Sequence, residues 1–420
     1  MNDRFKLGAD MIRWPLSFLL LVALPLLGLL AAGREIAPYL EIPPQTRYVT
    51  PAGFSWGWFV FFSAIDLLLV GVLAGAVTCG RRRMRESIGD PTAAGPRKDY
   101  RPRRGGVKHP IGPPGDGTSA DPAGRPNPGR FPWWGWAGLA LCLTSWFMAW
   151  QRFAWFRLFQ PHTFLPIWLG FILLVNALTV QRSGSCLILR RPLGFLMLFP
   201  ASAAFWWIFE YLNRFVQNWY YTGIEGLGPG AYSGFSSLAF ATVLPGVLSV
   251  MALLHTIPTL SKGLARCRPI DLPASPWIAV ATLAAAASGL ALIGIFPDQL
   301  FALLWVAPLL IALSIQRLSG QPTALASLQR GDWRPLVVPA LAALACGFFW
   351  EMWNSFSLAR WTYTIPFVQR FHLFEMPIVG YGGYLPFGLQ CLVAGTVVIG
   401  DPFGPGRKET LAACEKRGRQ

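Results

Sequence analysis

Residues 164–181 read FLPIWLGFILLVNALTVQ and carry no charged side chain. A helix needs roughly 20 mostly apolar residues to cross the hydrocarbon of a bilayer, so this stretch predicts a membrane-spanning helix. The whole chain has the same character, since 53% of its 420 residues are hydrophobic, only 13% are charged and the mean hydropathy is +0.42. This composition excludes a water-soluble enzyme, a disulfide-stapled secreted domain and a disordered regulator.

Nine further windows share this apolar character, and most are bordered by Trp, Tyr, Lys or Arg, which favour membrane interfaces. We therefore expect an all-α polytopic membrane protein with about ten transmembrane helices. The ten windows, in chain order, are residues 14–32, 55–79, 132–150, 164–181, 192–211, 235–255, 276–296, 300–316, 335–353 and 384–400.

The distribution of basic residues predicts the orientation, because loops rich in Lys and Arg stay on the cytoplasmic side. With the N terminus inside, 29 of the 36 Lys and Arg residues fall in cytoplasmic segments. We therefore expect both termini in the cytoplasm and a multi-pass protein of the cell membrane, which is the inner membrane in a Gram-negative bacterium. The net charge of +16 is spread over six segments, which argues against nucleic-acid binding.

The first window has a second interpretation, as a cleaved signal peptide. Small residues, Ala31, Ala32 and Gly33, follow its apolar run, as they do at cleavage sites. The nine later windows need no separate export signal, and their topology is the same in both interpretations.

Residues 80–131 differ from the rest of the chain, being dense in Pro, Gly and Arg and nearly free of large apolar side chains. Such a segment buries too little surface to offset its ordering entropy. We predict a disordered cytoplasmic linker that follows two N-terminal helices (1–79), and a basic cytoplasmic tail at 401–420. The basic clusters of the linker are candidates for contact with anionic lipids, because each Lys or Arg near the membrane surface contributes about 1 kcal/mol of binding free energy.

The eight later windows form two groups of four with matching cues, which predicts a tandem repeat of residues 132–275 and 276–400. Six cues recur in the same order at offsets of 135 to 144 residues. Because each unit has an even number of spans, the copies share one orientation and an axis along the membrane normal. The cues pair Pro132-Trp133 with Pro276-Trp277, Gln181-Arg182 with Gln316-Arg317, Pro192-Leu193 with Pro335-Leu336, Phe205-Trp206 with Phe349-Trp350, Trp219-x-Tyr221 with Trp361-x-Tyr363, and Leu244-Pro245 with Leu385-Pro386.

Three acidic residues fall inside predicted spans. An ionisable side chain there raises the free energy of membrane insertion by about 2.5 to 3.5 kcal/mol, so each of the three is a functional candidate by default. Asp66 lies in the second span, and Glu210 and Glu351 lie near the outer ends of the fifth and ninth. The two glutamates begin a Glu-x-x-Asn pattern with Asn213 and Asn354, which puts each pair on one helix face. Their offset of 141 differs from that of the neighbouring cues, so their strict equivalence is left open.

Two of these acids also have a purely structural interpretation. Glu210 has the i,i+4 spacing for an ion pair with Arg214. Asp66 is a candidate for a hydrogen bond to Asn176 of the fourth span within the helix bundle.

The long outside loops after the fifth and ninth spans each contain Trp-x-Tyr beside acidic residues. An interfacial aromatic belt is the simpler explanation. Recurrence in both units instead favours a cavity in which the rings hold a cationic or developing-cation group. The predicted substrate-binding residues are Asn213, Trp219, Tyr221, Asn354, Trp361, Tyr363 and Asp66.

One His-x-x-Glu pair, His372 and Glu375, lies in the second long loop. With His162 it supplies two imidazoles and a carboxylate, but without a spacing typical of a metal site, so no metal is predicted. The seven cysteines fall in predicted spans or on the cytoplasmic side, which predicts reduced thiols without a metal. No nucleotide-binding or hydrolase motif occurs, and the cofactor is unknown.

Three functions fit these features. The first is an enzyme acting on a lipid or isoprenoid at the outer half of the membrane, with Glu351 and Glu210 as proton donor and acceptor and Glu375 and His372 as further catalytic candidates. The second is a proton- or ion-coupled secondary transporter, and the third is a membrane scaffold or assembly factor. The polar features gather at the outer ends of the spans rather than at mid-membrane, which favours the enzyme.

Overall fold

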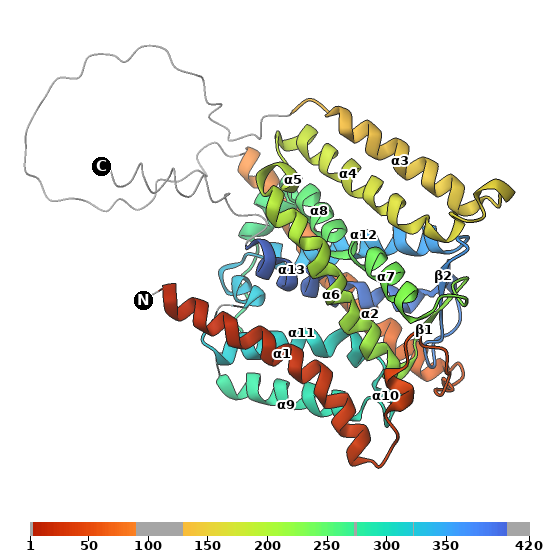
Figure 1. The fold of residues 1–420 in the computed structure, drawn as a ribbon. Helices are drawn as coiled ribbons and strands as arrows, with labels where there is room; N and C mark the ends of the chain where they lie inside the picture. Colours follow the sequence, from red (N-terminus) through yellow and green to blue (C-terminus); the bar gives the residue numbers. More distant parts are fainter. Residues whose placement is uncertain (1–2, 90–128, 273–274, 322, 401–420) are drawn as a thin grey trace, which may run out of the picture.

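A bundle of slanted helices makes up the computed structural model, which describes residues 3–89, 129–272, 275–321 and 323–400 (Figure 1). Each of the ten predicted windows contains a helix. The helices are α1 (Asp3–Ala31), α2 (Trp56–Gly89), α3 (Trp133–Trp150), α4 (Phe164–Ser183), α5 (Leu187–Arg190), α6 (Pro192–Val216), α7 (Pro229–Phe240), α8 (Val243–His255), α9 (Pro276–Leu292), α10 (Pro297–Leu300), α11 (Leu303–Leu318), α12 (Arg334–Asn354) and α13 (Tyr384–Ile399).

Six helical stretches are long and apolar enough to cross a membrane. Three shorter apolar helices correspond to the first, seventh and eighth windows, while α3 is less hydropathic because it is rich in Trp. The protein is therefore a mostly helical membrane protein with six candidate spanning helices in its described residues, and the other four spans stay predictions. The six stretches are Trp56–Glu86, Gln160–Ser183, Pro192–Val216, Pro229–His255, Arg334–Asn354 and Ile378–Ile399.

Helix α2 is the clearest lipid-facing element. Only 6% of its apolar window is buried inside the protein, and Leu67 and Leu68 are 72% and 68% exposed. A continuous apolar surface of this kind is stable in hydrocarbon and not in water. The helix runs to Gly89, with an ion pair of 3.0 Å between Arg82 and Glu86, so the predicted linker is helical at its start. The rest of that linker, 90–128, and the predicted tail, 401–420, lie outside the described residues.

The centre of the bundle consists of α6, α8, α12 and α13, which pack against one another. The pair α3–α4 lies on one side of this centre, and α9–α11 with α1 lies on the opposite side (Figure 1). Glycine permits the close approach of α3 and α4, because a Cβ on Gly170 would lie 2.5 Å from the nitrogen of Cys142. Small residues at such contacts let membrane helices pack backbone to backbone.

Gly170→Val is therefore expected to separate α3 from α4. The added side chain has no space, and overpacking of this kind lowers the free energy of unfolding by about 1 to 3 kcal/mol. The thermal unfolding midpoint of the detergent-solubilised full chain should fall by several degrees. Gly230→Val on α7 is the matched control, since no atom lies within 4 Å of a Cβ there. Equal losses in the two variants would contradict this packing.

Two antiparallel strand pairs, absent from the all-α prediction, lie in the long loops. Strand β1 (Trp219–Thr222) follows α6 and pairs with β2 (Arg360–Tyr363), which follows α12; β3 (His372–Leu373) pairs with β4 (Met376–Pro377). The pair β1–β2 lies at one end of the bundle, at the right in Figure 1. It joins the two Trp-x-Tyr segments, because Trp219 lies opposite Tyr363 and Tyr221 opposite Trp361.

Candidate binding and catalytic site

Glu210 lies near the C-terminal end of α6 and is only 3% exposed. Its Oε1 accepts hydrogen bonds from Nε1 of Trp206 (2.9 Å), Nε1 of Trp219 (3.1 Å) and the hydroxyl of Tyr221 (2.6 Å). The indole nitrogens can only donate, so the carboxylate oxygen is the acceptor. With three donors directed at it, Oε1 is held as an acceptor, and Glu210 is placed to receive a proton along one of these hydrogen bonds.

Glu351 lies near the end of α12 and is fully buried. Its Oε1 accepts hydrogen bonds from the hydroxyls of Tyr363 and Tyr384, both at 2.7 Å. Nε1 of Trp361 donates in turn to the hydroxyl of Tyr363 at 2.9 Å. Oε2 of Glu351 is buried and has no hydrogen-bond partner among the described residues. Both glutamates therefore accept Trp- or Tyr-derived hydrogen bonds through Oε1 and differ in the number of these donors.

The strand tyrosines keep their protons in this arrangement. Desolvation, followed by the negative charge of Glu210, raises the pKa of the Tyr221 hydroxyl well above its ordinary value. Desolvation, followed by the charge of Glu351, raises the pKa of Tyr363 in the same way. Both phenols therefore act as hydrogen-bond donors to the carboxylates at neutral pH.

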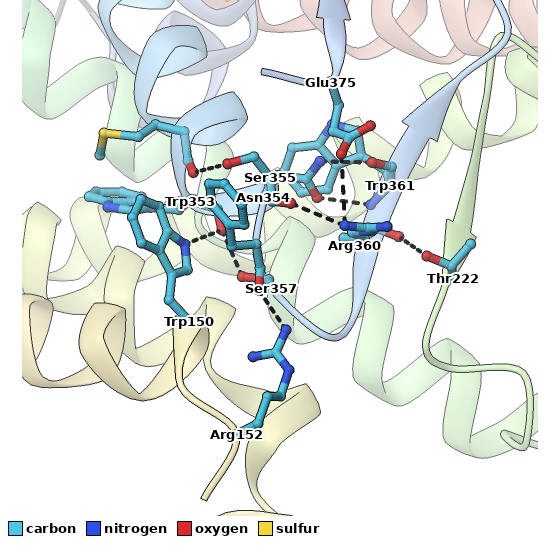
Figure 2. A network of polar contacts seen from close by, with 12 residues as sticks. Trp150, Arg152, Thr222, Trp353, Asn354, Ser355, Ser357, Arg360, Trp361 and Glu375 are labelled. Atoms are coloured by element: carbon cyan, nitrogen blue, oxygen red, sulfur yellow. Dashed lines mark hydrogen bonds and ion pairs between the residues drawn. The ribbon is translucent and has the colours of Figure 1, made fainter.

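Asn213 and Asn354 each hold the backbone of the tryptophan that follows. Nδ2 of Asn213 donates to the carbonyl of Trp219 (2.8 Å), and its Oδ1 accepts from the backbone N–H of Asn218 (2.8 Å). Nδ2 of Asn354 donates to the carbonyl of Trp361 (2.7 Å), and its Oδ1 accepts from the N–H of the same residue (2.8 Å), as Figure 2 shows. The spacing from Asn to Trp is one residue longer after α12 than after α6. The two Glu-x-x-Asn patterns are therefore 141 residues apart, and the two Trp-x-Tyr patterns are 142 residues apart.

An aromatic cavity of about 100 Å³ lies beside both glutamates. The carboxylates do not line it themselves, but their hydrogen-bond donors do, so each acid reaches the cavity through a Trp or Tyr side chain. Trp305 of α11 stacks on this wall, with 5.5 Å between its ring centroid and that of Trp219. The wall includes Trp206, Trp219, Tyr221, Trp361, Tyr363 and Tyr384.

Two further cavities share parts of this wall. The first, which we call the outer cavity, has a volume of about 450 Å³ and is lined by Glu210, Arg214, Trp219 and Tyr221. The second, which we call the Asp66 cavity, has a volume of about 220 Å³ and shares Trp219, Trp305, Tyr363 and Tyr384 with the aromatic cavity. Asn218 also lines the Asp66 cavity.

Neither structural interpretation of the acidic residues is correct. Glu210 and Arg214 form no ion pair, because the Arg214 side chain donates instead to the backbone carbonyl of Glu41. Asp66 does not bond to Asn176, whose Nδ2 donates to the carbonyl of Ile172 (2.9 Å) and to Oγ of Ser249 (2.7 Å). Both acids are thus left facing cavities.

The remaining catalytic candidates lie apart from this site. His372 is exposed on β3, and Glu375 forms an ion pair of 3.8 Å with Arg360, which Figure 2 shows. Neither residue lines any of the three cavities, although Arg360 lines the aromatic one. Within the described ranges, no group of three His, Cys, Asp or Glu side chains could hold a metal ion.

Several residues of the site were not predicted. Trp206 appeared only as a repeat cue, and Tyr384 only as the start of the tenth window. Trp305 lies within an apolar window and had no signal. Asn218 is buried with no hydrogen-bond partner for its side chain in the described part of the chain, which sequence alone does not reveal.

No family model, curated protein or solved structure matches this chain. The geometry of the site is therefore what indicates the function of this protein.

Proposed function

We propose that the protein is a membrane enzyme that acts on a lipid or isoprenoid whose reacting group is positively charged, or becomes so, in the aromatic cavity. The observation that carries this proposal is the placement of two buried carboxylates directly behind the Trp and Tyr side chains of one cavity. Aromatic faces attract a cation by about 2 kcal/mol or more where water is excluded. A carboxylate behind the rings adds Coulomb attraction.

The asymmetry of the two glutamates supports their separate roles. Glu351 is fully buried, and its Oε2, which has no partner among the described residues, can carry a proton; Glu210 accepts from three donors at Oε1 and lines the outer cavity. In the proposed reaction, Glu351 begins as the neutral acid. Tyr363 turns its hydroxyl from Oε1 of Glu351 to the substrate and gives up its proton, and the acid proton of Glu351 then passes to the Tyr363 oxygen. Tyr221 takes a proton from the substrate while its own moves to Glu210. Glu210 then releases this proton through the outer cavity, which it lines, and Glu351 is reprotonated from solvent before the next turnover. The substrate gains one proton and loses another, which is the balance of an isomerisation.

Glu351→Gln is expected to stop this proton transfer without unfolding the protein. The amide keeps the oxygen that accepts from Tyr363 and Tyr384 but has no acidic proton, and general acid–base groups contribute about 10²- to 10⁴-fold in rate. The measurement places the full chain in nanodiscs made from the lipids of its own cell membrane, in D₂O. Mass spectrometry then follows carbon-bound deuterium in each lipid class.

Wild-type protein should label one lipid class, and Glu351→Gln should do so at least about a hundredfold more slowly. Glu35→Gln, which alters an exposed carboxylate that lines none of the three cavities, is the control and should label normally. Labelling that is absent from every lipid, or equal in wild type and Glu351→Gln, would refute the enzymatic proposal.

We also propose that the chain is a tandem repeat of four-helix units, with ten spans in the cell membrane and both termini in the cytoplasm. Packing supports the repeat, since α3–α4 corresponds to α9–α11, and α6–α8 to α12–α13. The register of β1 and β2 supports it as well. A twofold axis through the pair Tyr220 and Thr362 exchanges Trp219 with Trp361 and Tyr221 with Tyr363.

A secondary transporter is the second candidate, and the Asp66 cavity favours it. Asp66 lines one cavity with Asn218, whose side chain has no hydrogen-bond partner in the described ranges, and this cavity shares a wall with the aromatic cavity. Carboxylate and amide oxygens suit a coupling ion or proton. Two results together would support this candidate over the enzyme. The protein would take up substrate into vesicles and lose this uptake in Asp66→Asn, and the lipids would show no deuterium exchange.

A further inference from the structure

Arg214 is a buried charge whose side chain forms no ion pair with any described residue. It is only 7% exposed and donates to the backbone carbonyl of Glu41. The carboxylate of Glu41 accepts instead from the backbone N–H groups of Thr46 (2.8 Å) and Gln45 (3.1 Å). The charges of Glu210 and Glu41 act on this guanidinium only from beyond ion-pair distance, so an anion in direct contact with it would stabilise it further.

The outer cavity is the space into which such an anion fits. Arg214 lines it together with Arg47, whose guanidinium lies 3.7 Å from the ring centroid of Tyr220. The cavity is also lined by the amide of Gln217 and by the carboxylates of Glu210 and Glu225, so an anion must bind on the side of the two arginines. A guanidinium presents several N–H groups in a planar fork that matches phosphate oxygens.

The outer cavity adjoins the aromatic cavity. Trp219, Tyr221 and Ile224 line both. One ligand can therefore place an anionic group on the Arg214 side of this wall and a cationic group on the aromatic side. The two charges of the ligand would then be only a few bonds apart.

We propose that the ligand of this site is a phosphate-bearing amphiphile, with its phosphate at Arg214 in the outer cavity and its positively charged part in the aromatic cavity. The chemistry is that of a phosphate close to a cationic group, either on a membrane lipid or free, for which phosphocholine is an unreactive probe. The binding of the cationic part of the ligand rests on the proposed function. The anion site at Arg214 is an addition to it, and an experiment can refute that site separately.

The test compares choline with phosphocholine as ligands of the full-length protein in phosphatidylglycerol nanodiscs, followed by tryptophan fluorescence. A charge-assisted hydrogen bond from Arg214 predicts that phosphocholine binds at least about tenfold more tightly than choline. Arg214→Gln should remove this preference without weakening choline. Arg157→Gln, an exposed arginine that lines none of the three cavities, should keep it.

The other possible results would overturn different parts of the proposal. Equal affinities in wild type, or a preference that survives Arg214→Gln, would overturn the anion site and leave the cation site standing. Failure of both ligands to bind would overturn the proposed function itself. If Arg214→Gln does not fold, Arg47→Gln on the exposed side of the cavity should lower the preference, and an unchanged preference there would also overturn the anion site.

The source of the phosphate group is tested by repeating the measurement in phosphatidylcholine nanodiscs. Weaker apparent binding of free phosphocholine there would identify the lipid head group as the competing ligand. Unchanged binding would identify a free phosphorylated compound. Both results support a phosphate site, and they distinguish its two sources.

Discussion

Glu210→Gln is expected to weaken choline binding by about thirtyfold, which corresponds to a loss of about 2 kcal/mol. The substitution removes the negative charge behind Trp206, Trp219 and Tyr221 while keeping an oxygen that accepts their hydrogen bonds. The wall of the aromatic cavity should therefore keep its shape. Tryptophan fluorescence of the full chain in phosphatidylglycerol nanodiscs measures the affinity.

Glu35→Gln is the matched control for this experiment. It makes the same change of charge on an exposed side chain that lines none of the three cavities. Its choline affinity should match that of wild type. If both variants lose affinity equally, the effect is one of overall charge, and Glu210 has no specific part in binding.

Asn213→Ala and Asn354→Ala are expected to cause the largest losses of stability in the site, about 2 to 4 kcal/mol each. Each truncation leaves two buried backbone groups without a partner, at about 1 to 3 kcal/mol per group. The strands β1 and β2 are then connected to α6 and α12 only through the hydrogen bonds to Glu210 and Glu351. Thermal unfolding of the detergent-solubilised protein should show a lower midpoint for both variants, together with weaker choline binding.

Asn218→Ala provides a control of identical chemistry at a neighbouring residue. Its side chain is as buried as that of Asn213, but neither polar atom has a hydrogen-bond partner in the described ranges. Truncation there should cost far less. A loss at Asn218 as large as at Asn213 would mean that the cost comes from lost volume, and that the two asparagines do not brace the strands.

The helices were predictable because bilayer thickness imposes a minimum apolar length that can be read locally. The strand pair was not, since residues 219–222 and 360–363 are far apart in sequence and too short to show a repeating pattern. Glu210, Glu351 and the two asparagines could be identified as a set from their Glu-x-x-Asn spacing. Their donors include Tyr384, which comes from another helix and is brought in only by tertiary packing.

Arg214 illustrates why spacing misleads at a helix end. The i,i+4 rule predicts an ion pair with Glu210 on a regular helix surface. Here Glu210 is already held by three donors, and the arginine extends to the carbonyl of Glu41 in the loop after α1. Only the packing of that distant loop determines this direction.

The central claim is that the aromatic cavity holds a positive charge. A structure of the full-length protein in nanodiscs with a bound quaternary ammonium ligand tests it most directly. We expect ligand density within about 6 Å of the ring centroids of Trp219 and Trp361, on the same side of the wall as Tyr221 and Tyr363. An empty aromatic cavity, with the ligand in the Asp66 cavity or at the lipid surface, would contradict it.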